Sequence, residues 1–312
     1  MLQVATSIKE IRNIIRHYKD SKTTIGFVPT MGALHEGHIS LIQQARKEND
    51  AVVASIFVNP LQFGANEDYG KYPRTFDTDC KLLTQEGVNV VFSPDSSEMY
   101  PDGFCTSIVP EHLENKLCGK SRPGHFGGVS VVVLKLFNLV KPDIAYFGQK
   151  DFQQTVIIRQ IVADLNLDVN IRVLPTIRDK EGLALSSRNA YLSKTEKKDA
   201  LCLYQALTRA QSLINEGIQS TEKIIHEMQN IINSRTSAKI DYISIVNPET
   251  LEAVSEAQHG DVAAVAVRIG KTRLIDNIIL MVLIVFLIQG ISNYPKLRCL
   301  TEHFQSMWSK VS

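Results

Sequence analysis

The spacing of hydrophobic residues divides the first part of the chain into short apolar runs and longer amphipathic segments. Alternating strands and helices predict a parallel sheet with helices on both of its faces. The short runs, which we expect to form strands, are residues 24–30, 51–60, 88–94, 143–148 and 169–175. The longer segments, which we expect to form helices, are residues 1–20, 38–50, 76–87, 127–140 and 151–166.

The pattern changes after the stretch RDKEGLALSSRNAYLS, residues 178–193. Two charged helical segments follow, at 195–217 and 221–235. They precede a strand at 239–247 and an apolar pair of segments at 261–278. The centre of that pair, RIGKTR, is typical of a hairpin turn between two strands. The second part of the chain is therefore predicted to be a smaller unit of helices and antiparallel strands.

Together these patterns predict an α/β protein with a Rossmann-like, doubly wound parallel sheet and a smaller α+β C-terminal domain. We expect a ligand-binding domain at 1–175, a smaller lid domain at 176–280 and an atypical apolar extension at 281–312. An unbroken apolar run of eleven residues, 278–288, leads into this extension. A membrane-spanning helix needs about 20 such residues, so we expect no span there. We also expect no catalytic chemistry in the extension, which could be an extra element covering the second domain, an oligomer contact, an interfacial anchor or an incidental extension.

The composition is that of an ordinary globular protein, with 44% hydrophobic and 21% charged residues in 312 positions. The formal net charge of +1 gives no whole-chain field that would attract nucleic acid or a membrane. The five cysteines are scattered and form no CxxC pair, which favours a reduced, cytoplasmic protein. The N-terminal segment is polar and lacks the apolar core of a signal peptide.

Candidate chemistry first occurs in the stretch FVPTMGALHEGHISLI, directly after the first long predicted strand. Ligands of an open parallel sheet bind beyond the carboxyl ends of its strands. Gly32 and Gly37 permit close approach of the backbone, and the next helix directs free N–H groups and its positive end at the loop. His35 and His38 could donate hydrogen bonds to phosphate oxygens, and either could become charged if a bound anion raised its pKa. The stretch therefore predicts an anion site.

Two other interpretations of this histidine pair stay open from the residues alone. The imidazoles could simply cap the helix, and the glycines could simply serve a tight turn. A zinc site is a weaker alternative, because neither a cysteine nor a third histidine nearby completes a ligand shell.

Polar side chains also follow two other predicted strands. Asn59 and Gln62 follow the strand at 51–60, where turn chemistry alone explains the Asn-Pro pair, although amides could also hold hydroxyl or carboxylate oxygens. Lys150 follows the strand at 143–148, and Gln154 lies on the first turn of the next helix. A lysine at such a turn directs positive charge at the ligand-binding edge of the sheet.

The remaining candidates lie in SRPGHFGGV and GLALSSRNAYLS. Arg122 and His125 of the first stretch are weaker candidates, because the stretch could be only a turn. Ser186, Ser187 and Arg188 of the second offer two hydroxyls and a guanidinium that suit phosphate oxygens. Taken alone, this second stretch could equally be a serine-rich helix start with a surface arginine.

Six stretches in order and spacing resemble the pantoate–β-alanine ligase family, which belongs to the nucleotidyltransferase superfamily with a HIGH-type signature. That signature stands here as HEGH, and the resemblance covers about residues 1–280. The six stretches are PTMGALHEGH, FVNPLQFG, YPRTFDTD, SRPGHFGGV, AYFGQKDFQQ and GLALSSRN.

The resemblance implies a ligase that uses ATP to join pantoate to β-alanine through a pantoyl adenylate, releasing pyrophosphate and AMP. It also implies a cytoplasmic homodimer that uses Mg²⁺ with ATP and that binds small molecules rather than nucleic acid. We assign no metal ligand, since Asp77 and Asp79 are weak candidates that could be helix-start carboxylates. The second domain, with Ser187 and Arg188 near its start, is expected to close over the phosphates and exclude water.

The resemblance also implies a role for each matching residue. His38 matches the family's proton donor, and the implied catalytic residues are His38, His35, Lys150, Ser187 and Arg188. Gln62 and Gln154 are implied to bind pantoate, and Gln62 also β-alanine. The implied ATP-binding residues are Met31, Gly32, Ala33, Leu34, His35, Glu36, Gly37, His38, Gly148, Gln149, Lys150, Asp151, Ile177, Leu185, Ser186, Ser187 and Arg188.

Two alternatives to the ligase come from other classes of function. A nucleotidyltransferase of the same superfamily would stop at an adenylylated or dinucleotide product, and a nucleotide-sensing protein would bind ATP without turnover. The intact set of histidines, lysine, serine and arginine argues against a pure sensor, which has no need of groups that stabilise a transition state. An NAD-linked dehydrogenase is disfavoured because no GxGxxG follows the first long strand.

Overall fold

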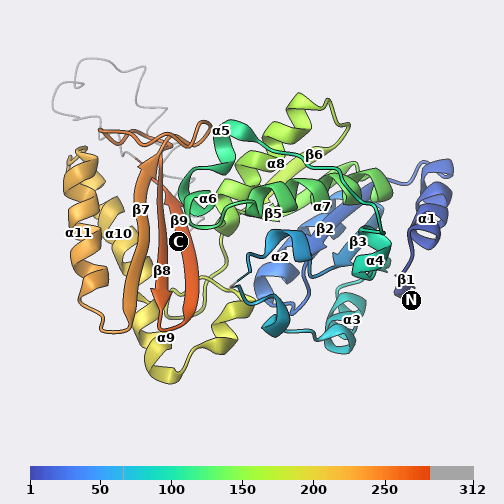
Figure 1. The fold of residues 1–312 in the computed structure, drawn as a ribbon, viewed down its shortest axis with the longest axis horizontal. Coiled ribbons are helices and arrows are strands. Elements are labelled where there is room, and N and C mark those ends of the chain that lie inside the picture. Colours follow the sequence, from blue (N-terminus) through green and yellow to red (C-terminus); the bar gives the residue numbers. More distant parts are fainter. Residues whose placement is uncertain (66, 282–312) are drawn as a thin grey trace, which may run out of the picture. The chain divides into compact units, whose positions relative to one another are not determined.

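Six parallel strands form the larger of the two sheets in Figure 1, in the order β1-β4-β3-β2-β5-β6. The computed structural model describes residues 1–65 and 67–281. The five strands predicted between residues 24 and 175 are all present, and the predicted fold class is confirmed. The strands are β1 (Gln3–Ala5), β2 (Ile25–Thr30), β3 (Ala51–Ile56), β4 (Val90–Phe92), β5 (Ile144–Gly148) and β6 (Asn170–Leu174).

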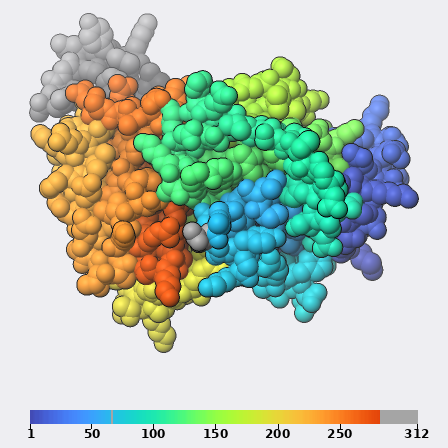
Figure 2. Space-filling view, viewed as in Figure 1, coloured from blue at the N-terminus to red at the C-terminus, as the bar shows by residue number. Residues whose placement is uncertain are grey.

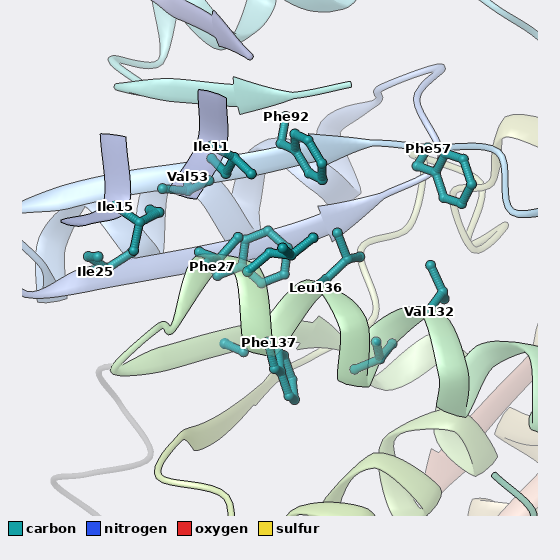
Figure 3. Packing of buried hydrophobic residues seen from close by; sticks show 14 of the residues in the cluster. Ile11, Ile15, Ile25, Phe27, Val53, Phe57, Phe92, Val132, Leu136 and Phe137 are labelled. Atoms are coloured by element: carbon teal, nitrogen blue, oxygen red, sulfur yellow. The ribbon is translucent and has the colours of Figure 1, made fainter. Parts of the chain in front are cut away.

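Helices pack on both faces of this sheet. Helices α1 (Ile8–Asp20) and α7 (His125–Val140) bury one apolar cluster, which Figure 3 shows around Phe27 and Phe137. Helices α2 (Glu36–Glu48) and α3 (Phe76–Gln85) cover the opposite face.

Successive strand residues explain why the strands are apolar throughout. Phe27 belongs to the first cluster and Val28 to the second, and Val90 and Val91 divide in the same way. Adjacent residues of a strand point to opposite faces, so a strand that is covered on both faces needs an apolar residue at every position.

Shorter elements connect the strands and frame the ligand-binding edge of the sheet. Helix α8 follows β5 through the one-turn element η3 and returns the chain to β6. The connecting elements are η1 (Pro60–Gln62), η2 (Tyr69–Lys71), α4 (Ser96–Met99), α5 (Glu111–Glu114), α6 (Leu117–Ser121), η3 (Gln149–Asp151), α8 (Phe152–Asp164) and η4 (Ser187–Tyr191).

The smaller sheet has three antiparallel strands in the order β7-β8-β9. Its strands are β7 (Ala238–Val246), β8 (Val262–Ile269) and β9 (Thr272–Ile279), and the turn between β8 and β9 falls within the predicted RIGKTR. Its helices are α9 (Lys194–Ala200), α10 (Cys202–Asn215) and α11 (Thr221–Asn233). The single helix predicted at 195–217 is thus divided into two, α9 and α10, at Leu201.

An apolar cluster joins the two sheets. Ile157 and Ile161 of α8 share it with Val246 of β7 and Val262 of β8. On the surface in Figure 2, the green segment that contains α5 and α6 lies against the orange part of the chain. Lys116, between α5 and α6, forms an ion pair with Glu252 in the connection from β7 to β8. Residues 1–281 accordingly form one compact unit that contains both sheets.

Residues 1–20 do not form the single helix that the sequence predicts, because Gln3–Ala5 pair with β4 as a strand before α1 begins. Ser7 is the N-cap of α1, where Ser7 and Glu10 form a capping box by exchanging hydrogen bonds. A serine followed by a glutamate three residues later is a sequence signal for this helix start. From position 282 onward, the expected extension lies outside the described residues.

Within the part of the chain that the structure describes, no helix is long and apolar enough to cross a membrane.

Candidate functional site

The candidate site lies where the connections of the large sheet change direction. From β2 the chain continues to β3 on one side, whereas β5 lies on the other side of β2 and leads outward to β6. The crevice beyond the carboxyl ends of β2 and β5 is therefore the topological switch point, where open α/β sheets bind ligands. His35, at the end of the loop after β2, and His38, in the first turn of α2, form the histidine pair, and η3 after β5 carries Lys150.

One cavity at this point brings together most of the residues implied by the resemblance. Five of the implied nucleotide-binding residues do not line it: Gly32, Ala33, Leu34, Glu36 and Gln149. The implied residues that do line it are Met31, His35, Gly37, His38, Gln62, Gly148, Lys150, Asp151, Gln154, Ile177, Leu185, Ser186, Ser187 and Arg188. All five implied catalytic residues and both implied substrate residues thus face one space, although they come from four separate segments of the chain.

The two histidines cap helix α2 and line the cavity at the same time. His35 Nδ1 accepts a hydrogen bond from Gly37 N at 3.1 Å, and His38 Nδ1 accepts one from His35 N at 3.3 Å. A neutral imidazole whose Nδ1 accepts must carry its proton on Nε2. Each ring therefore caps the helix through one nitrogen and keeps an N–H donor on the other. The interpretation as helix caps and the interpretation as phosphate donors are compatible.

Gly37 is required by this capping arrangement. A Cβ atom at position 37 would lie 2.8 Å from Cε1 and 2.9 Å from Nδ1 of the His35 ring. Any side chain there would displace the ring from the helix end. The glycine between the histidines thus leaves room for the first imidazole rather than for a tight turn.

Burial and a nearby cation keep both imidazoles neutral. Burial, with a contribution from Lys150, lowers the pKa of His35 to about 4. Burial, the neighbouring His35 and Lys150 lower the pKa of His38 to about 3. The two rings lie 4.1 Å apart between centroids, so a charge on one also opposes a charge on the other. Without a bound anion, the pair acts as two neutral N–H donors.

Asp79 holds the loop that leads to the histidines. Its carboxylate is 1% exposed and accepts hydrogen bonds from Ala33 N and Leu34 N, both at 2.9 Å, and from the Thr75 hydroxyl. Ala33 has a φ of 51°, an unusual backbone angle that these bonds stabilise. Asp79 is a weak metal candidate in the sequence. Its oxygens are instead occupied by the backbone of the loop.

A polar network positions Gln62. The Asn59 side chain is 1% exposed and donates hydrogen bonds to Gln62 Oε1 and to Gly128 O. His125 Nδ1 lies 2.7 Å from Gln62 O, and Arg122 Nη1 lies 2.9 Å from His125 Nε2. Because arginine can only donate, His125 Nε2 accepts and Nδ1–H donates to the carbonyl of Gln62. Burial and Arg122 lower the pKa of His125 to about 4, which keeps this tautomer neutral. Arg122 and His125 therefore hold the backbone of Gln62 in place through a chain of hydrogen bonds.

The cationic wall of the cavity comes from η3 and η4. Lys150 Nζ lies 3.6 Å from the Asp151 carboxylate. Arg188 makes a bidentate pair with Asp68 through Nε and Nη2, at 2.9 and 2.8 Å. This use of two N–H groups leaves three others on the guanidinium. Although burial raises it, the hydrogen bonds and charge of Arg188 lower the pKa of Asp68 below its ordinary value.

The serines link this wall to the histidine loop. Ser187 Oγ donates to Ala33 O at 3.0 Å, across 154 residues of sequence, and Ser186 caps η4 by accepting from Arg188 N. The stretch GLALSSRN thus contains a short helical start, as one of its two interpretations predicts, but Arg188 pairs with Asp68 and lines the cavity instead of lying free on the surface. Its position on the cavity comes from the fold.

Sequence reasoning missed an apolar part of the cavity lining. Four residues of helix α7 line the cavity: Val129, Val132, Val133 and Leu136. Their segment, VSVVVLKL, is apolar over most of its circumference, which predicts burial but does not separate core positions from cavity-lining ones. Tyr72 also lines the cavity, and its block YPRTFDTD was among those that carried the resemblance.

A doubly wound parallel sheet with neutral imidazole donors at its switch point, and with a lysine and an arginine lining the same cavity, is typical of an α/β enzyme that binds a nucleotide. Residues 3–279 match the family model described as Pantoate-beta-alanine ligase. The chain belongs to that family, as the resemblance predicted.

The sequence aligns with those of pantothenate synthetases over nearly the whole length of each relative. The chain is 52% identical over 279 residues to the pantothenate synthetase of Thermotoga neapolitana, with 89% of this chain and 100% of the relative covered. It is 51% identical to that of Caldicellulosiruptor saccharolyticus, with 89% and 99% covered.

Solved structures of pantothenate synthetases share the fold. One from Thermus thermophilus superposes with a TM-score of 0.86 at 42% identity, covering 90% of this chain and 100% of the other. The pantoate-beta-alanine ligase of Francisella tularensis, complexed with beta-gamma ATP and beta-alanine, gives a TM-score of 0.76 at 41% identity, covering 89% and 98%.

Proposed function

We propose that this chain condenses pantoate with β-alanine at the expense of ATP, through a pantoyl adenylate. The observation that carries the proposal is a single cavity whose lining combines two kinds of chemistry. Imidazole, lysine, serine and arginine groups that suit phosphates line it together with four apolar residues of α7 and two glutamine side chains. Pantoate combines a carboxylate and hydroxyls with a dimethylated carbon. The apolar residues of α7 suit those methyl groups, and Gln62 and Gln154 suit the oxygens.

In the first half-reaction, a pantoate carboxylate oxygen forms a bond to the α-phosphorus of ATP, and the bond to the pyrophosphate oxygen breaks. The protein's task is to hold the two anions in line and to neutralise charge that moves to the leaving group. The Nε2–H groups of His35 and His38 donate to phosphate oxygens, and Lys150 and Arg188 contribute positive charge. Arg188 can do so with its remaining N–H groups while it stays paired with Asp68.

In the second half-reaction, the amine nitrogen of β-alanine attacks the acyl carbon of the adenylate. The bond from that carbon to the phosphate oxygen breaks, AMP leaves, and the new amide nitrogen loses its proton. Gln62 holds the amine substrate near the acyl carbon, because its amide is already oriented by Asn59 and its backbone by His125. Exclusion of water matters at this stage, since water would hydrolyse the adenylate.

Mg²⁺ is proposed to enter with ATP. In residues 1–65 and 67–281, no group of three or more His, Cys, Asp or Glu side chains is placed to hold a metal ion. Asp79 is occupied by backbone N–H groups. The lining of the cavity is compatible with an ion that is held chiefly by triphosphate oxygens and water, the usual arrangement for Mg²⁺ with a nucleotide. The bound ion would offset phosphate charge.

The proposal predicts a substrate dependence that can be measured directly. Pyrophosphate release from Mg-ATP should require pantoate, and it should show one burst per site without β-alanine and steady turnover with it. The burst reports the adenylate, and the turnover reports its capture by the amine. The measurement is a coupled pyrophosphate assay, with ATP alone as its control.

Each alternative function gives a different result in that assay. Steady release without any amine would indicate a nucleotidyltransferase that stops at an adenylylated product. ATP binding with no pantoate-dependent release, in folded protein, would indicate a nucleotide sensor. Either result would contradict the ligase.

We also propose that the protein is a cytoplasmic homodimer whose residues 176–280 form a lid domain on residues 1–175. The four cysteines in the described part of the chain are free thiols, which suits a reducing compartment. The apolar cluster shared by α8 and the small sheet limits the lid to a small movement. Small-angle scattering should give the mass of two chains and a slightly smaller radius of gyration with ATP and pantoate. A monomer mass, or an unchanged profile, would contradict the dimer or the closure respectively.

A further inference from the structure

We propose that Asn277, in the small sheet, is a positioning residue for Lys150. Asn277 lies on β9, and its side chain is 3% exposed. Its Nδ2 donates hydrogen bonds to Gln149 O and to Lys150 O, both at 3.0 Å. Its Oδ1 accepts from Gln149 Nε2 at 3.2 Å. One buried amide is thus fully used on the turn that carries the lysine, 127 residues away in sequence.

The two carbonyls matter because they flank one α-carbon. Gln149 O belongs to the peptide plane before Lys150, and Lys150 O belongs to the plane after it. Peptide units are rigid planes, so fixing the orientation of both planes fixes φ and ψ between them. The direction of the Lys150 Cα–Cβ bond follows from those two angles. Asn277 therefore sets where the lysine side chain starts.

Fixing the start of the side chain matters because a lysine side chain has many rotamers and does not hold its ammonium group in one place by itself. The ammonium group is a point charge on a flexible four-carbon stem. Its Asp151 contact, at 3.6 Å, is long for a hydrogen bond. A displacement of about 1 Å in a catalytic group can reduce the rate about a hundredfold. A firm base for the stem confines the charge to the phosphate side of the cavity.

The preceding residue of β9 strengthens the same attachment. Asp276 is 3% exposed and accepts from Arg178 Nη2 at 2.9 Å, while its Oδ1 also accepts from Asn277 N at 2.8 Å. Arg178 adjoins Ile177, which lines the cavity. Adjacent residues of β9 thus hold two sides of the site, and the small sheet contributes to catalysis without touching a substrate.

The proposal rests on the phosphate role proposed for Lys150, and a double-mutant cycle tests the two separately. The variants are Asn277→Ala, Lys150→Ala and both together, and the readout is adenylate formation from labelled ATP with enzyme in excess, which detects slow variants. We expect Asn277→Ala to reduce the rate about tenfold to a hundredfold in the native background and less than about twofold when Lys150 is already absent. Asn277→Asp, which has the same shape but no donor, should lose at least as much.

Thr221→Ala is the matched control. Thr221 is also buried, and its hydroxyl also lies within hydrogen-bond distance of two backbone carbonyls, those of Val254 and Ser255, which are not part of η3. The Thr221→Ala variant should lower the unfolding temperature while leaving the rate near that of the native protein. Equal factors for Asn277→Ala in both backgrounds, or native rates for Asn277→Asp, would overturn the positioning role. A native rate for Lys150→Ala alone would instead overturn the role proposed for Lys150.

Discussion

His38→Asn is expected to fold like the native protein and to form adenylate about a hundredfold to a thousandfold more slowly. The asparagine Oδ1 occupies nearly the place of the imidazole Nδ1, so it can still accept from His35 N and cap α2. It has no group in the place of Nε2–H, which is the donor proposed for the phosphates. Pre-steady-state pyrophosphate release measures the rate, and urea unfolding measures the stability.

His38→Gln is the complementary variant. Its amide nitrogen reaches the place of Nε2 and can donate, but its longer chain loses the cap. It should retain more activity than His38→Asn and lose about 1 kcal/mol of unfolding free energy. If the asparagine variant is active and the glutamine variant is inactive, the cap rather than the donor is the function of His38.

The unfolding free energy is expected to decrease by at least about 2 kcal/mol between pH 7 and pH 4.5. Burial lowers the pKa of His35 to about 4, that of His38 to about 3 and that of His125 to about 4, from an ordinary value of 6.5. In this window the unfolded chain binds protons that the folded chain does not. The contribution of these histidines to the unfolding free energy is therefore complete well above pH 6.5 and is lost as the pH falls toward their folded pKa values.

The same experiment separates these histidines from the carboxylates. Asp68, whose folded pKa lies below its ordinary value of 3.8, loses its contribution only at lower pH, as the pH falls through that folded pKa. Urea unfolding of the native protein and of His38→Asn at pH 7, 6, 5 and 4.5 should give a shallower slope for the variant. A stability that is constant or higher at pH 5 would mean that the imidazoles take up protons in the folded state.

The local sequence was sufficient for most of the elements. Five strands of the large sheet and the hairpin of the small one follow from apolar runs bounded by turn residues, because those signals lie within a few residues of one another. The strand at Gln3–Ala5 was missed, since three residues are too few to show a period. The break at Leu201 was missed because both halves of the segment have helical composition.

The site divides in the same way. HEGH after β2 and Lys150 after β5 were predictable, because the carboxyl ends of parallel strands meet at one edge. The second function of Asn59, as a buried link between Gln62 and Gly128, was not predictable from its turn sequence. Nor did any pattern separate the cavity wall of α7 from the rest of that apolar helix.

By itself, the sequence determined the alternating α/β architecture, the family and many of the residue types that line the cavity. Only the tertiary structure decided how those residues are held: His125 behind Gln62, Asp79 under the histidine loop and Asn277 on the turn of Lys150. It also decided the tautomers and the neutral state of the histidines. The physical reason is that hydrogen-bond partners and burial arise between segments far apart in the chain, where no local period or propensity records them.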